Sequence, residues 1–231
     1  MTTPVRPTRR WFVRTGLRLS VLGAAVVLTV VLAEHTTTAA FTTQTGDTGN
    51  QVGAAASFCA TPGSGWGINT EDTSIFESSQ TANTGATGNL TVLSATGGNT
   101  RSLIRFTLPP IPSGCSLTTA TLSLYAVSSA ANRTIDVYRV DPAAPVWAEA
   151  GVTWNSRPAP TGAPVGSASL GAAGRQTWTV TPLMAALYAA PPNGFLVQDA
   201  LEGDATGKSQ SFASSENATV ANHPKLQVTW G

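Results

Sequence analysis

Short runs of alternating apolar and polar residues, each bounded by Gly, Pro, Asn or Asp, recur from about residue 90 to residue 230. Side chains along an extended strand point to opposite faces in turn, so each run would have one apolar and one polar face. Ile104 and Phe106, for example, share the face opposite to Arg101 and Arg105. Equivalent runs occupy residues 120–127, 134–140, 175–180, 195–199, 209–214 and 225–230. The pattern predicts an all-β protein, with an antiparallel sandwich or barrel.

Two segments depart from this alternation. Residues 181–189 favour one short helix, because Thr181 is a suitable N-cap and Pro182 a suitable first helical residue. The loop-forming sequence Pro-Pro-Asn-Gly at residues 191–194 follows the predicted helix. The glycine-rich residues 63–67 favour a turn.

The first 40 residues have the pattern of an export signal. Five arginines precede residue 20, and residues 19–33 are uncharged and mostly apolar. That run suits a signal peptide, because a membrane span needs about 20 such residues. Small residues at 38–40 permit cleavage before Phe41. We therefore predict a signal peptide with its helix at residues 1–40, a Thr/Gly/Ala-rich linker at 41–64 and one secreted domain at 65–231, with an uncleaved anchor as the alternative.

Charge excludes several classes of partner. Charged residues are 11% of the chain, against roughly 25% in an average domain. Removal of residues 1–40 takes away five of the 13 basic residues and one of the 12 acidic ones, which leaves a net charge of about −3. No basic stripe can form on such a surface, so we expect no nucleic-acid partner, and membrane contact only through the leader before cleavage.

Cys59 and Cys115 are the two cysteines. Export places them in an oxidising compartment, where pairing is expected. Closing the loop between them would stabilise the fold by roughly 4 kcal/mol. Two separate buried thiols are the alternative, and the absence of any CxxC pair argues against a zinc site.

Residues for acid–base chemistry are sparse, so we predict that the protein is not an enzyme. His223 lies in a polar stretch typical of a surface loop, and no other histidine follows residue 40. Glu149 is a candidate glycosidase carboxylate, but we expect it to pin a loop by accepting backbone N–H bonds. No cofactor is expected, although the carboxylates of Asp199, Glu202 and Asp204 suit a structural Ca²⁺; a solvated acidic loop is the simpler interpretation.

The motif Trp-x-Glu-x-x-Val-Thr-Trp-Asn-x-x-Pro stands complete at residues 147–158. Further motifs are Asp72, Asn-x-Gly at 83–85, an Arg-rich strand at 101–109, Ala-x-Leu-x-Leu at 120–124, and segments at 178–181, 193–194, 212–216 and 224–226. With these, residues 66–230 resemble the DNRLRE-domain family, which overlaps with carbohydrate-binding module family 96. The resemblance implies an extracellular, two-sheet antiparallel jelly-roll β-sandwich. Thr107 departs from the pattern, since the family usually has Asp there.

The same resemblance implies a non-catalytic module that binds a neutral or acidic polysaccharide, or a cell-wall glycan, on one sheet face. Arg101 and Arg105 would lie about 13 Å apart on one strand face, which suits two acidic groups of such a ligand. The alternative is that an arginine pairs with a cross-strand acid and binds no ligand. Tyr125 and Trp66 are candidate stacking platforms for sugar rings.

A second hypothesis is a structural module of the extracellular matrix or cell surface that self-associates without a sugar ligand. Residues 39–45 resemble leaders cleaved by the endoplasmic-reticulum-type signal peptidase of some Gram-positive bacteria, whose substrates include biofilm-matrix proteins. Trp147, Trp154 and Trp178 belong to the family's structural motifs, so we expect them in the core.

Overall fold

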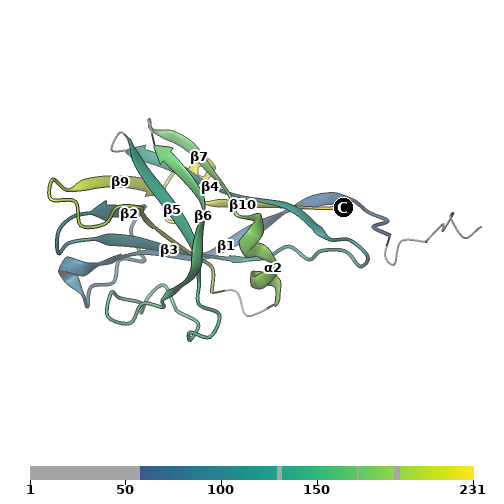
Figure 1. Ribbon diagram of the computed structural model, residues 1–231, viewed down its shortest axis with the longest axis horizontal. Coiled ribbons are helices and arrows are strands. Elements are labelled where there is room, and N and C mark those ends of the chain that lie inside the picture. The colour runs from purple at the N-terminus through teal and green to yellow at the C-terminus, as the bar shows by residue number, and fades with distance from the viewer. Residues whose placement is uncertain (1–57, 129–131, 171, 190–192) are drawn as a thin grey trace, which may run out of the picture. The chain divides into compact units, whose positions relative to one another are not determined.

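The structure is a computed structural model that describes residues 58–128, 132–170, 172–189 and 193–231, without the side chains of residues 166–170. The predicted signal helix, its cleavage site and most of the predicted linker lie outside these residues. Along the chain the elements are β1 (Gly63–Phe76), η1 (Glu77–Ser79), β2 (Asn89–Ser94), β3 (Thr100–Thr107), β4 (Leu117–Ser128), β5 (Arg133–Val140), β6 (Pro160–Leu170), β7 (Gly174–Thr179), α2 (Thr181–Ala189), β8 (Phe195–Asp199), β9 (Lys208–Ala213), η2 (Val220–Asn222) and β10 (Lys225–Trp230) (Figure 1).

The strands pair in antiparallel fashion, and α2 is the one α-helix of the described residues. The prediction of an all-β antiparallel protein with one short helix is therefore confirmed. Each alternating run of the sequence corresponds to a strand: β3, β4, β5, β7, β8, β9 and β10.

Hydrogen bonds connect the strands into one continuous sheet. Its order is β1-β10-β4-β9-β2-β3-β8-β5-β6, with β7 paired to β4. Since β1 also pairs with β3, six strands close into a ring: β1, β10, β4, β9, β2 and β3. The joint between β2 and β3 is a single residue pair, Leu93 with Thr100. The expected two-sheet jelly-roll sandwich is thus not confirmed, because the sheet closes on itself as a barrel.

The long first strand is the physical reason for this closure. Its first part, residues 63–67, pairs with β10, and residues 68–76 pair with β3. The strand passes from one neighbour to the other between Gly67 and Ile68, and its register with β3 shifts just after that, between Asn69 and Glu71. One continuous backbone therefore joins what would otherwise be the edges of two sheets.

The start of β1 corrects the interpretation of residues 63–67 as a turn. A Cβ on Gly65 would lie 2.8 Å from the Cβ of Pro109, and one on Gly67 would lie 3.2 Å from the Cβ of Leu226. Glycine is needed here because the strand runs too close to its neighbours for a side chain. These glycines stand at the positions where a strand normally has apolar side chains, so the sequence shows no alternation here.

Two apolar clusters lie on opposite faces of β3. Ile104 and Phe106 belong to the larger cluster, which also receives Trp178 and residues of α2. Leu103 points the other way, into a smaller cluster that consists of Ile75, Leu103, Val140, Trp147, Val152, Trp154 and Leu196. The loop of residues 141–159 supplies three members of this smaller cluster. β3 is therefore covered on both faces, and Trp147, Trp154 and Trp178 are buried as expected.

Cys59 and Cys115 form a disulfide, as predicted. The bond links the segment before β1 to the segment before β4. In the described part of the chain, no helix has the length and apolar character needed to cross a lipid bilayer.

Candidate functional site

Both arginines of the predicted binding face have acidic partners. Arg105 donates to Glu71 over 2.6 Å, and these two residues are directly opposite each other on β3 and β1. Arg101 forms two hydrogen bonds of 2.8 Å with Glu202, in the loop after β8. The alternative of pairing with a cross-strand acid therefore describes Arg105, and Arg101 pairs with an acid from a loop.

The loop of residues 141–159 also covers this face of β3. The Arg101 guanidinium lies 5.0 Å from the ring centroid of Trp154, and that of Arg105 lies 5.3 Å from the ring centroid of Trp147. Leu103, between the two arginines, packs in the same cluster as both indoles. Each arginine is thus held by an acid and an aromatic ring, so the structure gives this pair a role in attaching the loop.

Trp66 and Tyr125, the two predicted stacking residues, lie together on a different surface. The outer face of β1, β10, β4 and β7 consists of Ser64, Trp66, Ile68, Thr119, Thr121, Ser123, Tyr125, Arg175, Thr177, Thr179, Lys225, Gln227 and Thr229. A single cross-strand row joins Trp66, Gln227, Thr121 and Thr179. Tyr125 is four residues further along β4 than Thr121, so the two rings are about 10 Å apart across the strands and about 13 Å along them.

The chemistry of this outer face differs from that of the interior. Trp66 is 58% exposed and Ile68 is 68% exposed, whereas Leu226 and Val228, on the inner face of the adjacent β10, are buried in the core. Small hydroxyl side chains surround them, and Lys225 and Arg175 are the charged members. The Arg175 guanidinium lies 5.8 Å from the Tyr125 ring centroid and also donates to the carbonyl of His223. The face thus offers a flat aromatic ring, hydroxyl groups and positive charge, without a carboxylate among its members.

The three acids that we considered as ligands of a structural Ca²⁺ form salt bridges with arginines. Asp199 is buried and accepts two hydrogen bonds from Arg133, over 2.6 and 2.9 Å. Asp204 accepts a third from the same guanidinium over 3.1 Å, and Glu202 pairs with Arg101 as described above. These residues, which we call the paired acids, do not gather their ligand atoms at one point. Their loop is neutralised by arginine rather than merely solvated.

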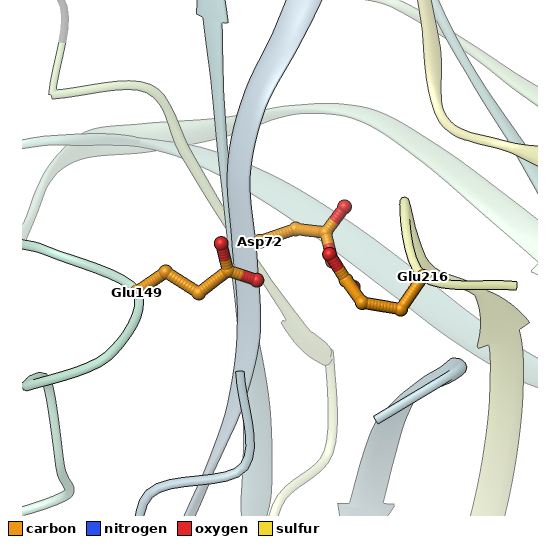
Figure 2. A group of neighbouring side chains, drawn as sticks. All are labelled: Asp72, Glu149 and Glu216. Atoms are coloured by element: carbon orange, nitrogen blue, oxygen red, sulfur yellow. The ribbon is translucent and has the colours of Figure 1, made fainter. Parts of the chain in front are cut away.

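A second group of acids does bring its carboxylates together. The sequence did not predict that these three residues would meet in the fold. Asp72 on β1, Glu149 in the loop after β5 and Glu216 in the turn after β9 place one carboxylate oxygen each within 4.8 Å of one another. Figure 2 shows the three side chains meeting beside β1 from these separate segments. No salt bridge engages any of the three within the part of the chain that the structure describes. We call this group the carboxylate cluster.

Two members of the cluster, Asp72 and Glu149, lie where solvent is scarce, whereas Glu216 is exposed. Burial raises the pKa of Asp72 to about 6 against the lowering effect of its hydrogen bonds. Burial is also the main cause that raises the pKa of Glu149 to about 7, and the charges of Glu216, Asp72 and Glu71 raise it further. The ionised forms of these carboxyls are therefore costly, and a proton or another cation would relieve the repulsion.

Glu149 and His223 were the candidate acid–base residues. The Glu149 carboxylate accepts a hydrogen bond from the backbone of Asp72, in part the loop-pinning role that we expected, but its Oε1 atom is buried without a partner. His223 is half-buried beside η2, with its Nε2 atom 2.7 Å from the carbonyl oxygen of Asn217. Among the described residues, no hydrogen bond or ion pair connects Glu149 with His223, so the two do not form a catalytic pair.

A shallow pocket of about 370 Å³ lies within the loop of residues 141–159. Its lining is mostly small and apolar, and includes Val146 and Pro158. The one charged residue of the lining, Arg157, stacks over Trp154 at 4.0 Å from the ring centroid. The two polar side chains of the pocket already have partners within the loop: Ser156 bonds to Thr153, and Arg157 donates to the carbonyl of Trp154.

Comparison with known proteins agrees with the sequence resemblance. The sequence profile of carbohydrate-binding module family 96 matches residues 68–230, from the exposed Ile68 to the last residue of β10. A search among curated proteins finds no significant match.

Proposed function

The chain belongs to carbohydrate-binding module family 96, and from this premise we propose that it is a secreted, non-catalytic module that binds polysaccharide on the outer face of β1, β10, β4 and β7. The observation that carries the proposal is Trp66, whose indole is 58% exposed on a β-sheet surface. Ile68, on the same strand face, is 68% exposed, and an exposed apolar patch that is rimmed by polar groups indicates a contact with a partner.

The neighbours of Trp66 suit a sugar chain. A pyranose has an apolar ring face that packs on an indole, and its hydroxyl groups need hydrogen-bonding partners. Gln227 and Thr121, on the two adjacent strands, supply such groups in the same row as Trp66. Tyr125 lies about 13 Å further along the strands and about 10 Å across them, so an extended polysaccharide that runs obliquely over this face would touch both aromatic residues.

Charge on the outer face favours an acidic polysaccharide over a neutral one. Lys225 and Arg175 provide positive charge there, and no acid stands among the members of this face. These two residues replace Arg101 and Arg105 in our proposal, because both of the latter are already paired with acids. Uronate or sulfate groups are the expected partners of Lys225.

Affinity electrophoresis and calorimetry with neutral, uronate-containing and sulfated polysaccharides test the proposal. Trp66→Ala should weaken binding by up to about tenfold, because packing of a ring on an aromatic face contributes about 0.5–1.5 kcal/mol. Leu201→Ala is the matched control, since Leu201 is 70% exposed but lies in the loop after β8. Lys225→Ala should weaken binding of acidic polysaccharides alone. Retention on none of these polymers, or equal effects of Trp66→Ala and Leu201→Ala, would overturn the proposal.

The exposed pair Trp66 and Ile68 also favours a second candidate function, a structural module that self-associates. Analytical ultracentrifugation separates the two. A monomer at all concentrations that binds polysaccharide supports the first function. A concentration-dependent dimer that Trp66→Ala dissociates, with no sugar bound, supports the second.

A further inference from the structure

The carboxylate cluster joins three parts of the chain that are far apart in sequence. Asp72 comes from the middle of β1, Glu149 from the loop of residues 141–159, and Glu216 from the turn between β9 and η2. Their side chains point towards one another in Figure 2, although Glu216 is also exposed to solvent. This convergence is unlike that of an exposed acidic loop, in which neighbouring charges diverge.

Unpartnered oxygen atoms are a second, independent indication of a ligand. Asp72 is 0% exposed, and its Oδ1 atom has no hydrogen-bond donor, whereas its Oδ2 atom accepts from Asn69 and from the backbone of Ser215. Glu149 Oε1 and the amide oxygen of Asn69 are also buried without a donor. Three buried acceptors in one small region lack the donors that buried oxygens normally have, and a cation is a partner that satisfies acceptors alone.

The surrounding chain is shaped to bring Glu149 to this position. A Cβ on Gly85 would collide with Cγ and with the backbone oxygen of Glu149, so only glycine leaves room for the glutamate. The Asn83 amide donates to the carbonyl of Glu149 and, over 2.9 Å, to that of Val152. The backbone of Glu149 donates in turn to Glu71 over 3.2 Å. The glutamate is therefore held against Asp72 by specific contacts, despite the repulsion between the two carboxylates.

Neighbouring positive charge does not neutralise the cluster. Glu71, which accepts a hydrogen bond from the Glu149 backbone, pairs with Arg105 over 2.6 Å, and in the described residues no salt bridge connects an arginine or lysine to the three cluster acids. Glu216 accepts a hydrogen bond from the Ser215 hydroxyl, which carries no charge. Burial of like charges without a counter-charge is unfavourable, and ions that coordinate carboxylates commonly compensate it.

We propose that Asp72, Glu149 and Glu216 bind one Ca²⁺ ion, which joins β1 to the loop after β5 and to the turn after β9. All donors are oxygen atoms, which selects a hard cation over zinc or copper. Their carboxylate oxygens lie within 4.8 Å of one another, and oxygens on opposite sides of one Ca²⁺ are about 5 Å apart. Mg²⁺ needs a near-ideal octahedron at shorter distances, which ligands from three separate segments do not readily provide.

Thermal unfolding and calorimetry of the purified full-length protein test this site, with CaCl₂, MgCl₂ or EDTA as the only variable. Ca²⁺ at about 100 times its Kd should raise the Tm by about 5–10 °C over EDTA, because it binds the folded state alone. Mg²⁺ should have a smaller effect. The readouts are Ca²⁺ binding and stability, so the result is independent of whether any polysaccharide binds.

Glu149→Gln and Glu216→Gln are the decisive variants. Each should abolish the Ca²⁺-dependent rise in Tm while leaving the Tm in EDTA equal to or above that of the wild type, because each removes one of the repelling charges. Glu216 is exposed, so its variant should fold even if the Glu149 variant does not. Glu202→Gln, among the paired acids, is the matched control and should keep the full Ca²⁺ response. The proposal is overturned if the wild type neither binds Ca²⁺ nor gains stability from it, if Glu216→Gln keeps the response, or if Glu202→Gln loses it.

Discussion

The paired acids and the carboxylate cluster contain three carboxylates each, but only the paired acids form salt bridges with arginines. Asp199, Glu202 and Asp204 lie within six consecutive residues, and arginines from β5 and β3 contact every one of them. Asp72 and Glu149 have no such partner among the described contacts, although they are 77 residues apart in sequence and meet in the fold. Closeness in sequence therefore says little about whether acids share a ligand. Whether acids can share a ligand depends on which basic side chains lie next to them in the folded protein.

The largest effect should follow removal of Arg133. Arg133→Leu leaves the buried Asp199 carboxylate without its two strongest donors, and an uncompensated buried charge should lower the free energy of unfolding by about 3 kcal/mol or more. Urea denaturation at neutral pH measures it. Asp204→Asn, which removes the charge of the half-buried partner of the same arginine, should cost much less. Similar losses for the two variants would mean that Asp199 does not depend on Arg133.

Gly85→Ala should have the next largest effect, this time on the carboxylate cluster. The added methyl group collides with Glu149 and should lower the free energy of unfolding by about 1–3 kcal/mol, with loss of the Ca²⁺ response. Gly98→Ala is the control, because a Cβ there meets only the Ala95 Cβ, at 3.7 Å. A Gly85→Ala variant as stable as Gly98→Ala would contradict the close approach of Glu149.

A smaller effect is expected from the bidentate pair of Arg101 and Glu202. Both side chains are partly exposed, at 17% and 20%, so solvent screens their attraction. A double-mutant cycle with Arg101→Gln and Glu202→Gln should give a coupling free energy of about 1 kcal/mol. A coupling near zero would show that the stack of Arg101 on Trp154 holds the arginine by itself.

The smallest effect on stability should come from Trp66→Ala, which touches neither acidic group. Its free energy of unfolding should stay within about 0.5 kcal/mol of the wild type, because the ring is largely exposed. Its polysaccharide affinity, by contrast, should fall. Chemical denaturation and affinity electrophoresis on one preparation check both statements, and a large loss of stability would remove Trp66 as a specific probe of the outer face.

Regular alternation allowed much of the fold to be predicted. β3, β4, β10 and the other alternating strands have one apolar face each, and Thr181 with Pro182 marks the start of α2. β1 escaped because Gly65 and Gly67 replace its apolar side chains, and β6 because Pro160 and its many small residues give no alternation. Closure of the barrel depends on which strands β1 pairs with, and no local pattern encodes that pairing.

The candidate site was harder to predict, because it depends on contacts between segments that are far apart in sequence. Trp66 and Tyr125 could be chosen from sequence as outward-facing aromatic residues, and the structure places both on one face, with Trp66 exposed and Tyr125 half-buried. The role of Arg101 and Arg105 depends on the loop of residues 141–159, whose indoles cover them only after folding. One feature of the sequence could have indicated the carboxylate cluster. Asp72 and Glu149 are both acidic residues of the family motifs, and the sequence offers no evident partner for either of them.

The disulfide has a mechanical consequence for this domain. Cys59 lies just before β1 and Cys115 just before β4, and β10 runs between these two strands. A pulling force that arrives from the N-terminal side therefore enters two strands at once through a covalent link. It loads β10 in shear along its length from both sides, instead of peeling β1 away one hydrogen bond after another.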